Sequence, residues 1–238
     1  MEILSYCKDD SKELLVDHIS AALEIVNPNS RLFRFAGRYA DFERAVRLAV
    51  VFHDSGKVFY QKRGRNGMSF MGHEYFSTYI FSSFINKLFK LDLENCDGLL
   101  RDAVTFTIFF HHHAMNVKLR KPKIDEKAVE LGVSLLDTFV GDVEQFLTAE
   151  ESDALKGAVE AITSQKPEDI ANGVVNYVEE RIRAVWREIM VNPKLKRLSY
   201  ATLLALTTAD YLSAQKNRKS GRTRFSAIVD EFYRFYIR

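Results

Sequence analysis

Residues 45 to 61 read AVRLAVVFHDSGKVFYQ and combine a helix signal with a cluster of chemically active side chains. Apolar residues recur at spacings of three and four along the first half, and His53 continues the series, which is the pattern of one helix face. The serine and glycine that follow Asp54 are expected to end the helix, because both disfavour a helix interior. The stretch therefore predicts a helix whose apolar face runs up to His53.

Similar spacing is found along the rest of the chain. It predicts further helices over 14–25, 73–88, 99–113, 126–140, 150–163, 168–190, 198–215 and 224–236. Only 4 prolines and 11 glycines interrupt the 238 residues, which is few for a protein of many short strands. No linker, internal repeat or low-complexity tract divides the sequence. We therefore expect an all-α fold, with residues 1–238 forming a single compact helical bundle.

The composition is that of an ordinary folded globule, with 47% hydrophobic and 28% charged residues. Cys7 and Cys96 lie far apart and in no zinc-binding pattern, so neither a disulfide framework nor a structural zinc is indicated. The start, MEILSYCKDD, lacks the features of a signal peptide, and the apolar runs are too short to span a bilayer. These features predict a cytoplasmic protein with no membrane partner.

The histidines are the most informative residues. There are six, at His18, His53, His73, His111, His112 and His113. A lone histidine on an apolar helix face is more often a hydrogen-bonded core residue than a ligand, but adjacent buried histidines carry a desolvation cost that a metal would offset. Asp210, after the run LLALTTA, is an acid on an apolar helix and needs a partner there. Imidazole and carboxylate groups can share a divalent-metal site in the interior of a helical bundle.

The order of these residues resembles the HD superfamily of metal-dependent phosphohydrolases. His18, the His53-Asp54 pair, His73, two adjacent histidines and Asp210 follow its order of H, HD, H, HH and D. HDSGKVFYQ at 53–61 is similar to the family's HD-x-G-K motif. Together with GHEYFSTYIF at 72–81, IFFHHH at 108–113 and LLALTTADYLSA at 203–214, it resembles the HD nucleases of type I CRISPR interference systems. The resemblance extends from about residue 14 to 214.

The resemblance implies a two-metal centre bridged by Asp54. One metal would have the ligands His18, His53, Asp54 and Asp210, and the other Asp54, His73, His111 and His112. Asp54 and Lys57 would be the catalytic residues, with Lys57 against a non-bridging phosphate oxygen. His113 stands where many relatives have a small residue, so the pair 112 and 113 remains the alternative to 111 and 112.

The chemistry implied is hydrolysis. Two divalent ions roughly 3.5 to 4 Å apart can deprotonate a shared water, orient it towards phosphorus and neutralise charge on the phosphate. Mixed imidazole and carboxylate ligands suit Mn, Co, Ni or Fe(II), and are less natural for Mg alone. The sequence leaves the metal identity open.

Single-stranded DNA, with RNA as a further candidate, is the substrate that the resemblance implies, and the basic residues that follow the metal motifs support it. These are Lys57, Lys62, Arg63 and Arg65; Lys118, Arg120, Lys121 and Lys123; and Lys216, Arg218, Lys219, Arg222 and Arg224. Such residues could track a phosphate backbone, while Tyr60, Phe70 and Tyr211 could stack bases. The alternative interpretation is that these loops are simply solvated and the aromatic residues belong to the core.

Two motifs that the sequence lacks, a phosphate-binding loop and a Gly-Tyr-Pro triplet, bear on the expected partners and on the alternative functions. Gly56-Lys57 is not part of a phosphate-binding loop, so the chain resembles the form in which a separate CRISPR helicase subunit and an RNA-guided surveillance complex are partners. A small-nucleotide or cyclic-dinucleotide phosphohydrolase is the alternative, although HHHAMNVKLRKP has no Gly-Tyr-Pro motif. A degenerate, non-enzymatic scaffold is disfavoured because every expected ligand is present.

Overall fold

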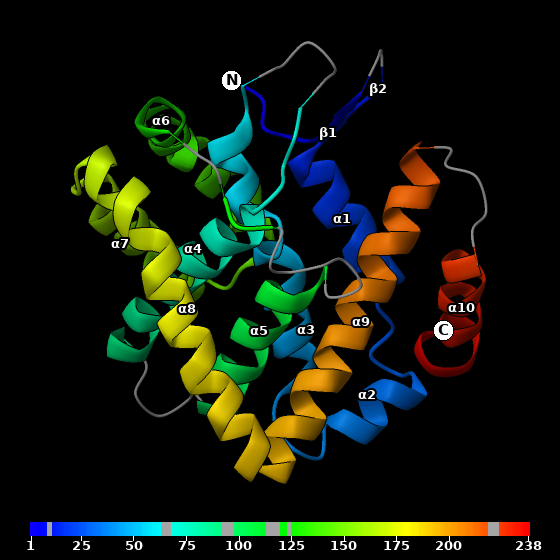
Figure 1. Ribbon diagram of the computed structural model, residues 1–238. Helices are drawn as coiled ribbons and strands as arrows, with labels where there is room; N and C mark the ends of the chain where they lie inside the picture. Colours follow the sequence, from blue (N-terminus) through cyan, green and yellow to red (C-terminus); the bar gives the residue numbers. More distant parts are fainter. Residues whose placement is uncertain (9–10, 63–67, 92–97, 113–119, 123–124, 219–223) are drawn as a thin grey trace.

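The computed structural model describes residues 1–8, 11–62, 68–91, 98–112, 120–122, 125–218 and 224–238 (Figure 1). The fold is mostly helical, as expected, with one small β-hairpin. The principal elements are β1 (Leu4–Lys8), β2 (Ser11–Leu14), α1 (Leu15–Ile25), α2 (Arg31–Ala36), α3 (Phe42–Phe52), the 3-10 helix η1 (Ser55–Tyr60), α4 (His73–Leu91), α5 (Gly98–Phe110), α6 (Glu126–Val143), η3 (Glu144–Phe146), α7 (Ala149–Thr163), α8 (Pro167–Val191), α9 (Pro193–Arg218), α10 (Arg224–Phe232) and the π-helical turn η4 (Tyr233–Ile237).

The predicted helices are all present, but several boundaries differ. α5 ends at Phe110 instead of continuing to residue 113, so His111 and His112 lie in a turn. α9 begins at Pro193, five residues earlier than expected, because proline is well suited to the first position of a helix. α2 was not predicted at all, since six residues are too few to show helical periodicity.

The β-hairpin was also not predicted. β1 and β2 pair antiparallel, with Tyr6 opposite Glu13 and Cys7 opposite Lys12. Ser5 and Cys7 are buried while the residues between and beside them are more exposed, which is the alternation of a strand. Strands of five and four residues, one of them reading SKEL, are too short and too polar to predict from the sequence.

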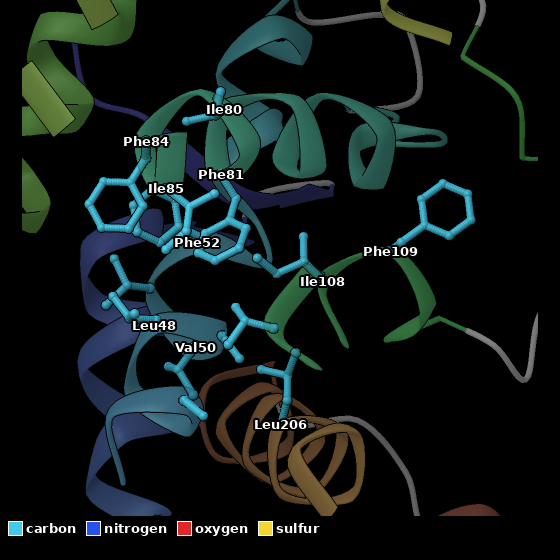
Figure 2. Packing of buried hydrophobic residues seen from close by; sticks show 14 of the residues in the cluster. Leu48, Val50, Phe52, Ile80, Phe81, Phe84, Ile85, Ile108, Phe109 and Leu206 are labelled. Carbon is cyan, nitrogen blue, oxygen red and sulfur yellow. The ribbon is translucent and has the colours of Figure 1, made fainter. Parts of the chain in front are cut away.

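α3 is the central helix, and from Leu48 to Phe52 every residue is buried. A helix that is apolar on all sides must be surrounded by others, and here α5, α9, α1 and α4 pack around it. Figure 2 shows Phe52 among the side chains of α4, with its ring centroid 4.6 Å from that of Phe84 and 5.4 Å from that of Phe81. Burying each such ring contributes roughly 1.5 to 3 kcal/mol, so the carboxyl end of α3 is held rigidly.

Gly56 explains how the residues after α3 approach α4. A Cβ atom at this position would lie 2.1 Å from the carbonyl oxygen of His73 and 2.5 Å from the backbone nitrogen of Ser77, so only glycine fits. The Gly56 N–H also donates to the Ser77 hydroxyl at 2.8 Å. This contact brings the start of η1 directly against the first turn of α4.

α7 is tied to α3 by a buried carboxylate. Glu151 belongs to a capping box with Thr148 at the start of α7. Its side chain is fully buried and accepts hydrogen bonds from Arg44 at 2.9 Å and from Arg47 at 2.7 Å, both on α3. These two arginines hold the pKa of Glu151 below its ordinary value although burial alone would raise it.

Within the described residues, no helix has both the length and the apolar character needed to cross a membrane.

Candidate metal centre

Five helices bring the seven predicted ligands together at one buried point. His18 lies on α1, His53 follows α3, and Asp54 is the next residue. The others come from the start of α4, the turn after α5 and the second half of α9: His73, His111, His112 and Asp210. All are buried except His112 and Asp210, which are partly exposed.

The ligand atoms fall into two groups. Asp54, His73, His111 and His112 form the first, and His18, His53 and Asp210 form the second. Within each group the candidate ligand atoms lie within 4.8 Å of one another. This is the same division into two sites, apart from the shared Asp54, that the resemblance implied.

Asp54 lies between the two groups. Its Oδ1 is 2.8 Å from His73 Nε2 and 3.9 Å from His111 Nε2. Its Oδ2 is 3.3 Å from His53 Nε2 and 3.7 Å from His18 Nε2. Each oxygen therefore faces one group, as a bridging carboxylate would require.

Three of the histidine rings are oriented by the same kind of hydrogen bond. His53, His73 and His111 each place Nδ1 on the carbonyl oxygen three residues earlier, at 2.8, 2.6 and 2.7 Å respectively. A carbonyl can only accept, so Nδ1 carries the hydrogen and, in the neutral ring, Nε2 has the lone pair. In all three, Nε2 is the atom that faces Asp54, which is the arrangement that orients metal-binding histidines.

His18 is oriented by side chains instead. Its Nδ1 lies 3.3 Å from Glu13 Oε1 and 3.3 Å from the Ser213 oxygen. The Ser213 hydroxyl donates to the Asp210 carbonyl at 2.8 Å, so its oxygen is an acceptor for His18. His18 Nε2 lies 3.1 Å from Asp210 Oδ1.

Sequence analysis missed Glu13 and Ser213. Ser213 lies three residues after Asp210, and this helical spacing was a signal that it shares a face with that acid. Glu13 offered no comparable signal, because its position depends on a hairpin that the sequence did not predict.

Acceptor atoms converge at the centre without enough donors. His73 Nε2 and His111 Nε2 lie 3.3 Å apart although the Nδ1 of each ring is engaged with a carbonyl. Among the described residues, His53 Nε2 is buried and makes no hydrogen bond. Lone pairs that face one another in a buried site repel unless a cation or a proton lies between them. The residues present therefore fit a site for metal ions.

The electrostatics of the two carboxylates agree with this. Burial would raise the pKa of Asp54, but His53 and Lys57 hold that pKa well below its usual range. The pKa of Asp210 is likewise held well below its usual range, against the effect of burial, by the hydrogen bond with His18 and by the nearby His53 ring. Both groups are therefore carboxylates at neutral pH.

The histidines of the two groups differ in basicity. Burial and neighbouring histidines hold the pKa of His111 well below its usual range and lower the pKa of His112 to about 4. For His53, burial acts in the same direction but the carboxylates of Asp54 and Asp210 raise the pKa to about 10. Without another cation, the second group would hold a proton, and a metal ion would displace it.

Lys57 is buried beside the same carboxylate. Its ammonium group lies 2.5 Å from Asp54 Oδ2, 3.0 Å from the carbonyl oxygen of Ser5 and 5.1 Å from the centre of the Phe70 ring. The lysine thus neutralises the Asp54 carboxylate at the oxygen that faces the second group. Its expected contact with a phosphate oxygen stays a prediction.

Several of the expected nucleic-acid contacts are engaged within the protein. Arg120 makes a bidentate ion pair with Glu74 at 2.6 and 3.1 Å. Lys121 pairs with Glu179 at 2.5 Å and Lys216 with Glu24 at 3.3 Å. Lys62 is exposed. Outside the described residues or side chains lie His113, Arg63, Arg65, Lys118, Lys123, Arg218, Lys219, Arg222 and Arg224.

The three aromatic residues proposed to stack bases are all partly buried. Phe70 lies beneath the Lys57 ammonium, and the Tyr211 ring packs edge-on against Phe225 with centroids 5.1 Å apart. The Tyr60 hydroxyl is buried and, among the described residues, makes no hydrogen bond. Base stacking by these residues stays a prediction.

Comparison of the chain with protein-family models, with curated proteins and with solved structures gave no match.

Proposed function

We propose that this chain is a metal-dependent phosphodiesterase of the HD type. One observation carries the proposal: the Nε2 atoms of His73 and His111 and the carboxylate of Asp54 converge at 2.8 to 3.9 Å as acceptors. The protein builds this cluster at a cost in desolvation, and a divalent cation is the group that offsets it.

The roles of the residues follow from their positions. Asp54 would bridge two ions, with His73, His111 and His112 on one side and His18, His53 and Asp210 on the other. Two divalent ions supply an activated water and neutralise charge on a phosphodiester. The carbonyl partners of the histidines hold the hydrogen on Nδ1 and leave each Nε2 as the nitrogen available to a metal ion. Mn, Co, Ni or Fe(II) suit this ligand set better than Mg alone.

For the substrate we propose single-stranded DNA, with RNA as the second choice. The support is the resemblance to type I CRISPR nucleases and the basic residues that follow the metal motifs. On this proposal the protein acts in the cytoplasm in antiviral defence, together with a separate helicase subunit and an RNA-guided surveillance complex.

The test compares substrates under a panel of metals. Purified protein is incubated with labelled single-stranded DNA, duplex DNA, single-stranded RNA and cyclic dinucleotides, each with Mn²⁺, Co²⁺, Ni²⁺, Fe²⁺ or Mg²⁺. We expect metal-dependent cleavage that is fastest on single-stranded DNA and absent after chelation. Faster turnover of cyclic dinucleotides would instead favour a dinucleotide phosphohydrolase. The absence of hydrolysis with every metal would refute the proposed phosphodiesterase activity.

A further inference from the structure

The N-terminal hairpin places a buried acid behind one of the candidate ligands. Glu13 on β2 is only 7% exposed, and acids are almost never buried this deeply without a partner. Its Oε2 accepts a hydrogen bond from the Ser5 hydroxyl at 2.8 Å, and its Oε1 faces His18 Nδ1 at 3.3 Å. The carboxylate therefore links the hairpin to the metal centre.

His18 needs such a partner because of its place in the helix. His53, His73 and His111 lie at helix ends, and each reaches the backbone carbonyl three residues earlier. His18 is the fourth residue of α1, where the helix itself uses the neighbouring carbonyl groups. Only a side chain can then accept the Nδ1 hydrogen.

We propose that Glu13 is a positioning residue that orients His18 as a metal ligand by accepting its Nδ1 hydrogen; the inference rests on the proposed metal-dependent function. With Nδ1 held in this way, His18 Nε2 is kept as the lone-pair atom and directed at Asp210 Oδ1, 3.1 Å away. A carboxylate behind a ligating histidine also makes the ring a stronger donor to the metal.

The hairpin is well anchored for this role. The Gln61 side chain bonds both backbone groups of Leu4, at 2.9 and 3.1 Å, and the Leu15 N–H donates to the Ile3 carbonyl at 2.8 Å. On β1, Ser5 contacts Glu13 through its hydroxyl and Lys57 through its carbonyl. One strand therefore supports both His18 and the lysine beside the bridging carboxylate.

The test uses variants that separate the hydrogen bond from the charge. Glu13→Leu removes the carboxylate acceptor and leaves the Ser213 oxygen, also 3.3 Å from Nδ1, whereas Glu13→Gln keeps an amide oxygen at the position of the carboxylate. Isothermal titration with Co²⁺ or Mn²⁺ gives the affinity of each bound ion. We expect Glu13→Leu to lower the affinity for one ion by about 10- to 100-fold and to leave the affinity for the other ion unchanged. Glu13→Gln should lower the affinity for the same ion only a few-fold. Glu24→Gln, an exposed acid on α1, is the matched control and should bind like the wild type.

A spectroscopic readout distinguishes positioning from general loss of structure. Long-range ¹H–¹⁵N spectra report the tautomer of each histidine, and only His18 should change in Glu13→Leu. In a His18→Ala background, adding Glu13→Leu should have no further effect on metal binding. If Glu13→Leu does not fold, Ser5→Ala tests the same link, because it removes the hydroxyl that holds Glu13; a several-fold loss at one ion is expected.

The outcomes separate this inference from the proposed function. A wild-type protein that binds no divalent ion would refute the metal-dependent function itself. Two ions bound by the wild type, with unchanged affinities in Glu13→Leu and Ser5→Ala, would overturn only the role of Glu13. A glutamine variant as weak as the leucine variant would also overturn it, since the retained acceptor should rescue binding.

Discussion

The Lys57 ammonium lies 2.5 Å from Asp54 Oδ2, so a positive charge is fixed beside one of the two oxygens of this carboxylate. The other oxygen, Oδ1, faces His73 at 2.8 Å. The two halves of the centre are therefore not equivalent. The half that contains His18 and His53 shares its carboxylate oxygen with a lysine, and the half that contains His73 does not.

Replacing Lys57 should destabilise the protein mainly when metal is absent. Lys57→Met leaves the buried Asp54 carboxylate without its ammonium partner, and breaking a buried ion pair in this way costs about 3 to 5 kcal/mol. A divalent cation would neutralise the same carboxylate and reduce the loss. Urea unfolding of both proteins with and without Mn²⁺ measures this. An equal loss of unfolding free energy in the two conditions would contradict the prediction.

Removing the central ligands should abolish cleavage but preserve the fold. His53→Ala relieves a cluster of converging acceptors, so it removes metal and little core packing. Asp54→Ala also removes metal, but it leaves the buried Lys57 ammonium without its carboxylate and should lower the free energy of unfolding as well. Metal content by elemental analysis should fall, and circular dichroism should stay that of the wild type. Asp137→Ala, an exposed acid on α6, is the control. Full activity in Asp54→Ala with unchanged metal content would rule out the two-metal interpretation.

The three consecutive histidines can be separated by single alanine substitutions. The structure includes His111 and His112 in the group around Asp54, with ring centroids 3.9 Å apart. We expect His111→Ala and His112→Ala to lose metal and activity, and His113→Ala to keep both. If His113→Ala loses metal while His111→Ala does not, the ligand pair is 112 and 113.

Salt dependence should distinguish a strand-binding nuclease from a dinucleotide enzyme. Each phosphate neutralised on a single strand contributes a slope of about −0.7 in log K against log salt. Five changes to Glu, at Lys216, Arg218, Lys219, Arg222 and Arg224, should weaken strand binding and flatten that slope. Hydrolysis of bis-p-nitrophenyl phosphate, which is expected to contact only the metals and Lys57, should persist. Unchanged strand binding would argue against a role for this basic group.

The contribution of Glu151 to the free energy of unfolding should be lost in acid. Its pKa is lowered in the folded protein, so its contribution is complete above the unfolded value of 4.5 and is lost as the pH falls through the lower folded value. Glu151→Gln should destabilise the protein by about 1 to 3 kcal/mol at pH 7, because Arg44 and Arg47 lose a buried carboxylate. Chemical denaturation from pH 7 down to pH 3 should show the difference shrinking. Glu160→Gln, an exposed acid further along α7, serves as the control.

Local patterns in the sequence determined the helical class and the set of candidate ligands. The spacing of three and four that predicts α3 reflects burial of one helix side, and this burial also places His53 and Asp54 in the interior. The resemblance carried by the order of the histidines and acids named the residues that the fold brings together in two groups. Short elements such as α2 and the hairpin escaped detection, because periodicity needs more residues than they contain.

Tertiary structure alone decided what surrounds those ligands. His18 meets Ser213 across 195 positions of the chain, and Arg120 meets Glu74 across 46. No local rule relates such residues, since their pairing depends on how whole helices pack. Sequence reasoning therefore placed Arg120 on a nucleic-acid surface, whereas in the fold its charge is paired with a buried acid. Glu13 reaches His18 for the same reason: a hairpin too short to predict packs against the amino end of α1.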